Sequence, residues 1–95
     1  MTNTPLGAGS IVVVPDHVLA RRAAGETVLM SLESEMYFSL EGPGSRLWDL
    51  IESGVTFGSA VDTLFDEYEV DRAELENDMA ELVNELSSNG LVVIA

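Results

Sequence analysis

The sequence predicts an α+β domain in which a three-stranded antiparallel sheet is followed by three helices. Before Gly42, apolar residues form short β-branched or alternating runs separated by turn residues. After Gly42, the apolar period lengthens to about 3.6 residues, which is typical of helices. The 95 residues suffice for a single core, and we expect a flexible tail over residues 1–10 and one domain over residues 11–95.

The first strand is expected over residues 11–14, a β-branched run that Pro15 ends. Residues 17–23 alternate only roughly between apolar and polar side chains. One interpretation is that residues 17–23 continue the first strand after a bend at Pro15, and the other is that they do not belong to it. Both interpretations place the N-terminal strand at one edge of the sheet.

Two further strands are expected over residues 26–32 and 36–40, with turns at residues 24–25 and 33–35. Since consecutive strands usually lie next to each other, the third strand forms the other edge of the sheet. Exposed edges are usually protected by Lys, Pro or a bulge, and residues 36–40 contain neither Lys nor Pro. We therefore expect this edge to pair with another chain.

Helix signals follow in a regular order. Pro43 suits the first turn of the first helix, Thr56 is a candidate N-cap of the second, and Asp71 is a candidate N-cap of the third. Gly90 is expected to end the third helix. The apolar run over residues 91–94 is compatible with a short paired strand or with a packed tail.

The third helix combines an apolar stripe with a one-sided row of carboxylates. The side expected to face the core carries Leu75, Met79, Leu82 and Leu86. One flank, here called the acidic rail, carries Glu74, Asp78, Glu81 and Glu85, whereas the opposite flank carries Arg72, Glu76, Ala80, Val83 and Ser87. Like charges at this spacing are mildly unfavourable. Two interpretations stay open, a solvated face that aids solubility and a surface that attracts Lys or Arg of a bound peptide.

Composition excludes several function classes. Seventeen acidic and four basic residues give a net charge of -13, which repels nucleic acids and anionic membranes. The chain has no Cys and no Lys, and its single His17 cannot form a catalytic triad or a multi-histidine metal site. We expect a protein that is not an enzyme, needs no cofactor or metal, has no signal peptide or membrane span and is cytoplasmic.

Several short motifs, taken in order, resemble those of one protein family, and the resemblance covers roughly residues 11–93. The motifs are Gly25-Glu26 before Val28-Leu29, Met36-Tyr37-Phe38-x-Leu40, Gly42-x-Gly44, Leu47-Trp48-x-Leu50-Ile51, Gly54-x-Thr56, Leu64, Tyr68-x-Val70, Leu75-x-x-Asp78 and Leu82-x-x-x-Leu86-x-x-x-Gly90-Leu91. In this order the sequence resembles the PqqD-like family, the RiPP recognition elements, and most of all the stand-alone members that accompany lasso-peptide biosynthesis. The turn at residues 33–35 departs from the family, because many members carry Gly there.

The resemblance implies a winged helix-turn-helix fold that binds the leader of a ribosomally made precursor peptide. In the family, the leader adds as a strand to the third strand, beside the third helix. The candidate peptide-binding residues are then Glu35, Met36, Tyr37, Phe38 and Ser39 on the strand, and Leu75, Asp78, Met79, Leu82 and Glu85 on the helix. Which face of the strand lines the groove is open, and we expect Met36 and Phe38 to point toward the helices and Tyr37 away from them.

The resemblance also implies partners. Lasso leaders present spaced Tyr, Pro and Leu anchors, and the bound precursor passes to a separate leader peptidase of the cysteine-protease type and to a cyclase. The alternative is a winged-helix domain that binds nucleic acid or regulates transcription. It is disfavoured because Arg72 is the only basic residue of the third helix.

Overall fold

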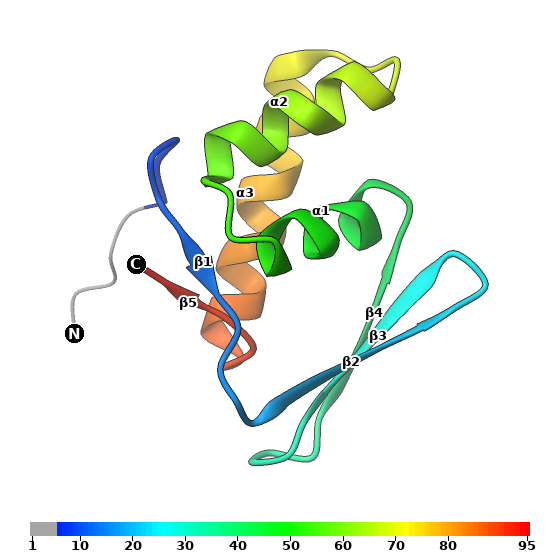
Figure 1. The fold of residues 1–95 in the computed structure, drawn as a ribbon, viewed down its shortest axis with the longest axis vertical. Coiled ribbons are helices and arrows are strands. Elements are labelled where there is room, and N and C mark those ends of the chain that lie inside the picture. The colour runs from blue at the N-terminus through cyan, green and yellow to red at the C-terminus, as the bar shows by residue number, and fades with distance from the viewer. Residues whose placement is uncertain (1–5) are drawn as a thin grey trace.

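The computed structural model describes residues 6–95 and has the expected α+β architecture (Figure 1). The antiparallel sheet contains, in spatial order, β2 (Val18–Ala23), β3 (Glu26–Ser31) and β4 (Tyr37–Glu41). The helices that follow are α1 (Pro43–Glu52), α2 (Phe57–Glu67) and α3 (Arg72–Ser88). The prediction of three antiparallel strands followed by three helices is therefore confirmed.

The expected first strand does not join this sheet. Residues 11–14 contain β1 (Val12–Val13), which pairs antiparallel with β5 (Val93–Ile94). Ile11 and Ala95 extend the pairing with two backbone hydrogen bonds, of 3.2 and 2.8 Å. The C-terminal run is thus a paired strand, and the first strand of the main sheet is the segment after Pro15. Val18 N–H donates to the Pro15 carbonyl, which closes the turn between β1 and β2.

Two turns set the register of the sheet. Ala24 and Gly25 have φ angles of 52° and 79°, as expected for a two-residue hairpin that matches the strand twist. Between β3 and β4, Glu35 has a φ of 60° and its N–H donates to the Ser31 carbonyl at 2.8 Å. Ser31 N–H donates in turn to the Met36 carbonyl at 3.0 Å, and β4 begins at Tyr37, one residue later than expected.

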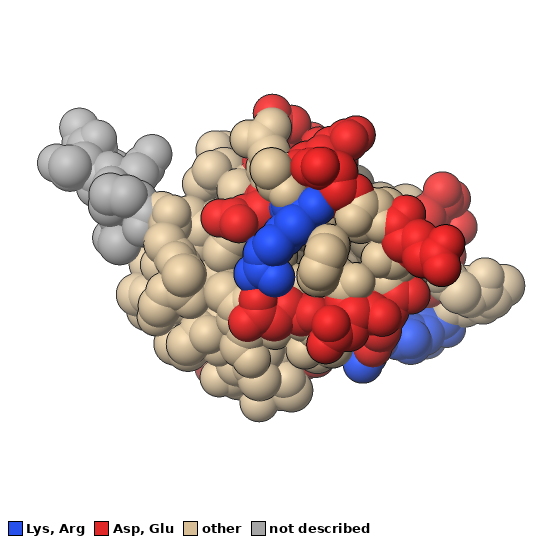
Figure 2. Space-filling view, turned by 90° about the horizontal axis from the view of Figure 1, so that it is seen from above, with Lys and Arg blue, Asp and Glu red and all other residues tan. Residues whose placement is uncertain are grey.

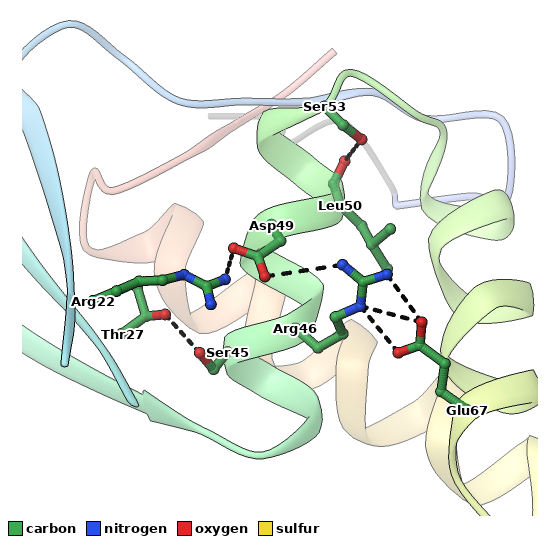
Figure 3. A network of polar contacts seen from close by, with 8 residues as sticks. All are labelled: Arg22, Thr27, Ser45, Arg46, Asp49, Leu50, Ser53 and Glu67. Atoms are coloured by element: carbon green, nitrogen blue, oxygen red, sulfur yellow. Dashed lines mark hydrogen bonds and ion pairs between the residues drawn. The ribbon is translucent and has the colours of Figure 1, made fainter. Parts of the chain in front are cut away.

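The helices cover one face of the sheet. Side chains of β3 that point toward them are fully buried, including Thr27 and Leu29. Thr27 Oγ1 and Ser45 Oγ lie 2.6 Å apart in this buried layer and connect β3 to α1 (Figure 3). Because both hydroxyls are paired, this polar contact inside the core carries no unpaired group. The single tryptophan, Trp48, is 1% exposed.

Polar contacts on α1 also connect the sheet to α2 (Figure 3). Asp49 pairs with Arg22 of β2, while Arg46 binds both carboxylate oxygens of Glu67 at 2.9 to 3.2 Å. The hydrogen bond from Arg46 lowers the pKa of Glu67, and the same bond raises the pKa of Arg46. Both groups are exposed to solvent, so this pair aligns α1 and α2 more than it stabilises them.

The buried side of α3 differs from the sequence expectation. Leu75, Met79 and Leu86 are buried as expected, but Val83 is 0% exposed and Leu82 is only half-buried. Val83 had been placed on the flank opposite the acidic rail. The buried arc is rotated toward Val83 because α3 packs against both α1 and α2, which leaves Leu82 at the margin of the core.

The segment before β1 contacts the start of α2. Gly58 N–H donates to the Ala8 carbonyl and Phe57 N–H to the Ser10 carbonyl, both at 2.8 Å. The flexible tail expected over residues 1–10 lies in part outside the described residues, and its boundary stays a prediction. Among residues 6–95, no helix has both the length and the apolar character needed to cross a bilayer.

Candidate functional site

One side of β4 has no hydrogen-bonding partner within residues 6–95. Leu29 lies opposite Phe38. Two residues away along each strand, Ser31 N–H bonds to the Met36 carbonyl. Hydrogen-bonded and non-hydrogen-bonded pairs alternate along an antiparallel ladder. Phe38 therefore directs its N–H and C=O toward β3, while Tyr37 and Ser39 direct theirs away from it. These outward groups form the open edge of β4.

Apolar side chains lie beside this open edge. Phe38 and Leu82 are half-buried and pack against the core from β4 and α3. A methyl group added at Gly44 would lie 3.2 Å from Leu82 Cδ2 and 3.9 Å from Leu40 Cβ. The bare backbone of Gly44 thus allows Leu82 of α3 to pack closely against the start of α1. Leu82 of α3 and Leu40 of β4 therefore meet at the same point of α1.

A hollow of about 200 Å³ lies between the start of α1 and the first turns of α3. Its apolar lining comes from Pro43, Val70, Leu75 and Met79, and its acidic lining from Asp71, Glu74 and Asp78. A hollow with this lining suits an apolar side chain of a bound peptide when a positively charged residue lies next to that side chain.

The start of α3 explains how this hollow forms. Asp71 caps the helix by accepting a hydrogen bond from Glu74 N–H at 3.0 Å. Val70 precedes this cap and Leu75 follows it at the fourth helical position, the spacing of a hydrophobic staple. Both side chains line the hollow. Neither Val70 nor Pro43 was expected as a site residue, although the staple spacing is a signal for Val70.

Acidic groups dominate the charged surface around α3. All four residues of the acidic rail are exposed. Figure 2, which looks onto the end of the molecule where α2 lies, shows Asp and Glu over a larger area than Arg. Arg72, the one basic residue of α3, is ion-paired with Asp62 of α2. The helix thus offers an electrostatic field that suits a cationic guest and opposes DNA.

The structure brings part of the predicted site together. Leu75, Asp78 and Met79 line the hollow, while Leu82 packs at the margin of the core against Gly44 of α1. Ser39 lies on the open edge, and its hydroxyl donates to Glu26 at 3.1 Å.

The structure shows which side chains of β4 face the helices and which point away from them. Phe38 points toward the helices and Tyr37, at 67% exposed, lies on the opposite face, as expected. Met36 differs from the expectation, because it precedes β4 and is 43% exposed instead of packing on the helices. Glu35 also lies in the turn, and Glu85 is exposed on α3. Contact of these residues with a guest stays a prediction.

His17 joins two ends of the domain. Its Nε2 lies 3.1 Å from the Gly90 carbonyl after α3, and its Nδ1 lies 3.5 Å from Glu33 in the turn before β4. Within residues 6–95, no group of three or more His, Asp or Glu side chains is arranged to hold a metal ion. These contacts give His17 a structural role.

Fold and site together define a class: a small winged helix-turn-helix domain that keeps one sheet edge open beside an apolar helix. A family model described as "Coenzyme PQQ synthesis protein D (PqqD)" matches residues 26–92. The chain therefore belongs to the PqqD family. A comparison with curated protein sequences finds no significant match.

Two solved structures share this fold. The structure of TbiB1 in complex with the TbiA(beta) leader peptide is 34% identical in sequence, with a TM-score of 0.80, over 84% of this chain and 93% of that one. The lasso peptide synthetase B1 complexed with the leader peptide is 24% identical, with a TM-score of 0.79, over 87% of this chain and 98% of that one. The second likeness concerns the fold alone.

Proposed function

We propose that this chain is a non-catalytic recognition module that binds the leader of a ribosomally made precursor peptide, in lasso-peptide biosynthesis. The leader adds as a strand to the open edge of β4, next to α3. The observation that carries the proposal is the outward direction of the Tyr37 and Ser39 backbone groups. Membership of the PqqD family and the leader peptide held by the similar TbiB1 support it.

Strand addition accounts for both affinity and specificity. Main-chain hydrogen bonds to Tyr37 and Ser39 supply affinity without regard to the guest sequence, and alternate side chains of the guest enter pockets. The hollow lined by Leu75 and Met79 offers such a pocket, and Asp78 at its wall favours a cation nearby. The half-buried Leu82 supplies further apolar surface beside the edge.

The proposed module carries out no reaction itself, so it delivers the bound precursor to other enzymes. The bound leader must be cut by a separate peptidase of the cysteine-protease type before a cyclase closes the ring, and the module holds the precursor for these enzymes. This part of the proposal rests on the family resemblance.

Fluorescence anisotropy tests the proposal. A fluorescein-labelled leader containing a Tyr-x-x-Pro-x-Leu motif is titrated with the chain, and a labelled DNA duplex is titrated in parallel. We expect saturable binding of the leader and none of the duplex at about 150 mM salt. Binding of the duplex without binding of the leader would refute the proposal and favour a nucleic-acid-binding domain.

A further inference from the structure

The ring of His17 lies between the two elements that border the proposed leader site. His17 is in the corner between β1 and β2, and its carbonyl accepts a hydrogen bond from Leu32 N–H at 2.8 Å. Nε2 lies 3.1 Å from the Gly90 carbonyl after α3, and Nδ1 lies 3.5 Å from a carboxylate oxygen of Glu33. Figure 1 shows this corner between the turn that precedes β4 and the end of α3.

Both partners of the ring accept hydrogen bonds and have no proton to donate. A neutral imidazole carries one N–H, so it satisfies one of the two contacts and turns a lone pair toward the other acceptor. An imidazolium carries two N–H groups and satisfies both contacts at once. The surroundings of His17 therefore suit the charged form of its ring.

The end of α3 adds to this preference. Leu91 N–H donates to the Leu86 carbonyl at 2.9 Å and Gly90 N–H to the Ser87 carbonyl at 3.1 Å, the two bonds of a Schellman motif. These bonds hold the Gly90 carbonyl in place. The C-terminus of a helix carries partial negative charge that favours a cation, and the last turn of α3 contains no basic residue. Protonated His17 supplies that cation.

One carboxylate faces the ring at ion-pair distance, that of Glu33 in the turn before β4. Glu35 in the same turn and Asp16 beside His17 are exposed and form no ion pair with the ring within residues 6–95. From the end of α3 the ring meets the Gly90 carbonyl and no carboxylate at ion-pair distance. Glu33 and the end of α3 are therefore the groups that respond to the charge of His17.

The turn that contains Glu33 leads directly into the open edge. Ser34 N–H donates to Ser31 Oγ at 3.2 Å, and the turn ends at Tyr37, the first residue of β4. The side chain of Glu33 is 77% exposed, so its ion pair contributes little to stability. Its effect is on the position of the turn, because a turn tied to the end of α3 fixes the start of β4 relative to that helix.

The other end of the proposed leader site is fixed by packing instead. There Leu82 of α3 packs against Gly44 at the start of α1. This apolar contact does not change with pH, whereas the contacts of His17 depend on the charge of its ring.

We infer that His17 is a positioning residue for leader binding: its imidazolium form ties the turn before β4 to the end of α3 and so holds the open edge at the distance from α3 that a leader needs. The inference rests on the proposed function. It makes leader affinity higher when His17 is protonated.

The pH dependence of leader affinity tests the inference. Affinity is measured by anisotropy at pH about 6 and pH about 8, the range in which histidine ordinarily titrates. The probe is a leader without His that carries a rhodamine label, because fluorescein itself titrates in this range. We expect the unmodified chain to bind the leader more tightly at the lower pH by about threefold or more.

Two substitutions of His17 separate positioning from a merely structural role. His17→Gln removes the charge and leaves every other titratable group in place, so it should bind at both pH values as weakly as the unmodified chain does at the higher pH. His17→Arg keeps a charge and several N–H donors at both pH values. It should bind at both as tightly as the unmodified chain does at the lower pH.

Two carboxylate variants complete the design. Glu33→Gln supplies an amide that donates to Nδ1 of the neutral ring, so leader affinity should no longer depend on pH. Asp16→Asn is the matched control, because it removes the same charge from the exposed residue next to His17, and it should keep the full pH dependence. Trp48 fluorescence confirms folding, and if His17→Gln does not fold, Glu33→Gln decides the question alone.

The inference is overturned if the affinity of the unmodified chain is the same at both pH values, or if His17→Gln and Glu33→Gln keep the unmodified pH dependence. In both cases the leader still binds and the proposed function stands. If the unmodified chain binds no leader at either pH, the proposed function fails first and the inference with it.

Discussion

Leu29 and Phe38 form a hydrogen-bonded cross-strand pair, so Tyr37 and Ser39 turn their backbone N–H and C=O groups away from β3. A guest strand would therefore bond to Tyr37 and Ser39 and not to Phe38. This alternation decides at which residue of β4 a substitution can remove a hydrogen bond to the guest strand without removing one to β3.

Proline at Ser39 should abolish strand addition while the domain stays folded. The substitution removes an N–H that points outward at an edge, the position in a sheet where proline is tolerated. Loss of one main-chain hydrogen bond and its neighbours should weaken leader binding by at least about tenfold in anisotropy.

Ala20→Pro is the control for this substitution. Leu32 N–H donates to the His17 carbonyl, so the alternation places the Ala20 N–H on the free edge of β2. The same chemical change then occurs at the other edge of the sheet, and leader affinity should be retained. Equal loss of affinity in both variants would indicate general damage to the sheet, and full affinity in Ser39→Pro would refute strand addition.

Neutralising part of the acidic rail should slow association with a basic leader. The double substitution Glu74→Gln and Asp78→Asn removes two charges from the lining of the hollow beside α3. We expect the association rate at low salt to fall by roughly tenfold or less, with a weaker salt dependence. Glu76→Gln with Glu69→Gln removes the same charge from exposed positions outside this hollow. Stopped-flow rates that are equal for the two pairs would mean that the rail is only a solvated surface.

Glycine at position 35 should stabilise the domain. Glu35 has a φ of 60°, which costs a residue with a side chain about 1 to 2 kcal/mol. Glycine avoids that cost but loses about 0.5 to 1 kcal/mol through its freer unfolded chain, so the net gain is about 0 to 1.5 kcal/mol. The midpoint of thermal unfolding, followed by Trp48 fluorescence, should rise by a few degrees.

Ser34→Gly provides the comparison for Glu35→Gly, because Ser34 lies in the same turn without a positive φ. It should leave the midpoint unchanged or lower it. A higher midpoint in Ser34→Gly than in Glu35→Gly would contradict the turn geometry.

The Arg46–Glu67 pair should make stability depend on acid. The hydrogen bond from Arg46 lowers the pKa of Glu67 in the folded state. Its stabilisation is therefore complete above the ordinary glutamate pKa, and it is lost as the pH falls through the lowered value. Urea midpoints of Glu67→Gln and of the unmodified chain should differ at neutral pH and converge as the pH falls below the lowered pKa of Glu67. A difference between Glu67→Gln and the unmodified chain that grows in acid would contradict the pairing.

Local signals in the sequence predicted the helices well. Thr56 and Asp71 were expected as N-caps, and each side chain accepts a hydrogen bond from the backbone N–H three residues on, at Ser59 and Glu74. These signals depend on neighbours within one turn of helix, so they can be read from the chain alone.

Long-range pairing was harder to predict. Residues 11–14 have the composition of a strand, but their partner is Val93–Ile94 at the other end of the chain. Local pattern could not choose between this partner and the main sheet. The buried arc of α3 likewise depends on which helices pack against it, and for this reason Val83, and not Leu82, completes the core.

The candidate site could likewise be predicted only in part from the sequence. Residues of the edge strand were expected from their composition, and the partners that line the hollow were expected in part from the stripe of α3. Which backbone groups of β4 point outward depends on the turn that precedes the strand, where Ser31 N–H bonds to the Met36 carbonyl. No periodicity within β4 itself contains that information.

Amide hydrogen exchange at Tyr37 and Ser39 tests the central claim most directly. Rates are measured by NMR for the free chain and for the chain saturated with leader peptide. Strand addition predicts that both amides exchange much more slowly in the complex, whereas Phe38, already bonded to β3, gains far less protection. A complex in which the leader is bound and the Tyr37 and Ser39 amides still exchange at their free rates would contradict it.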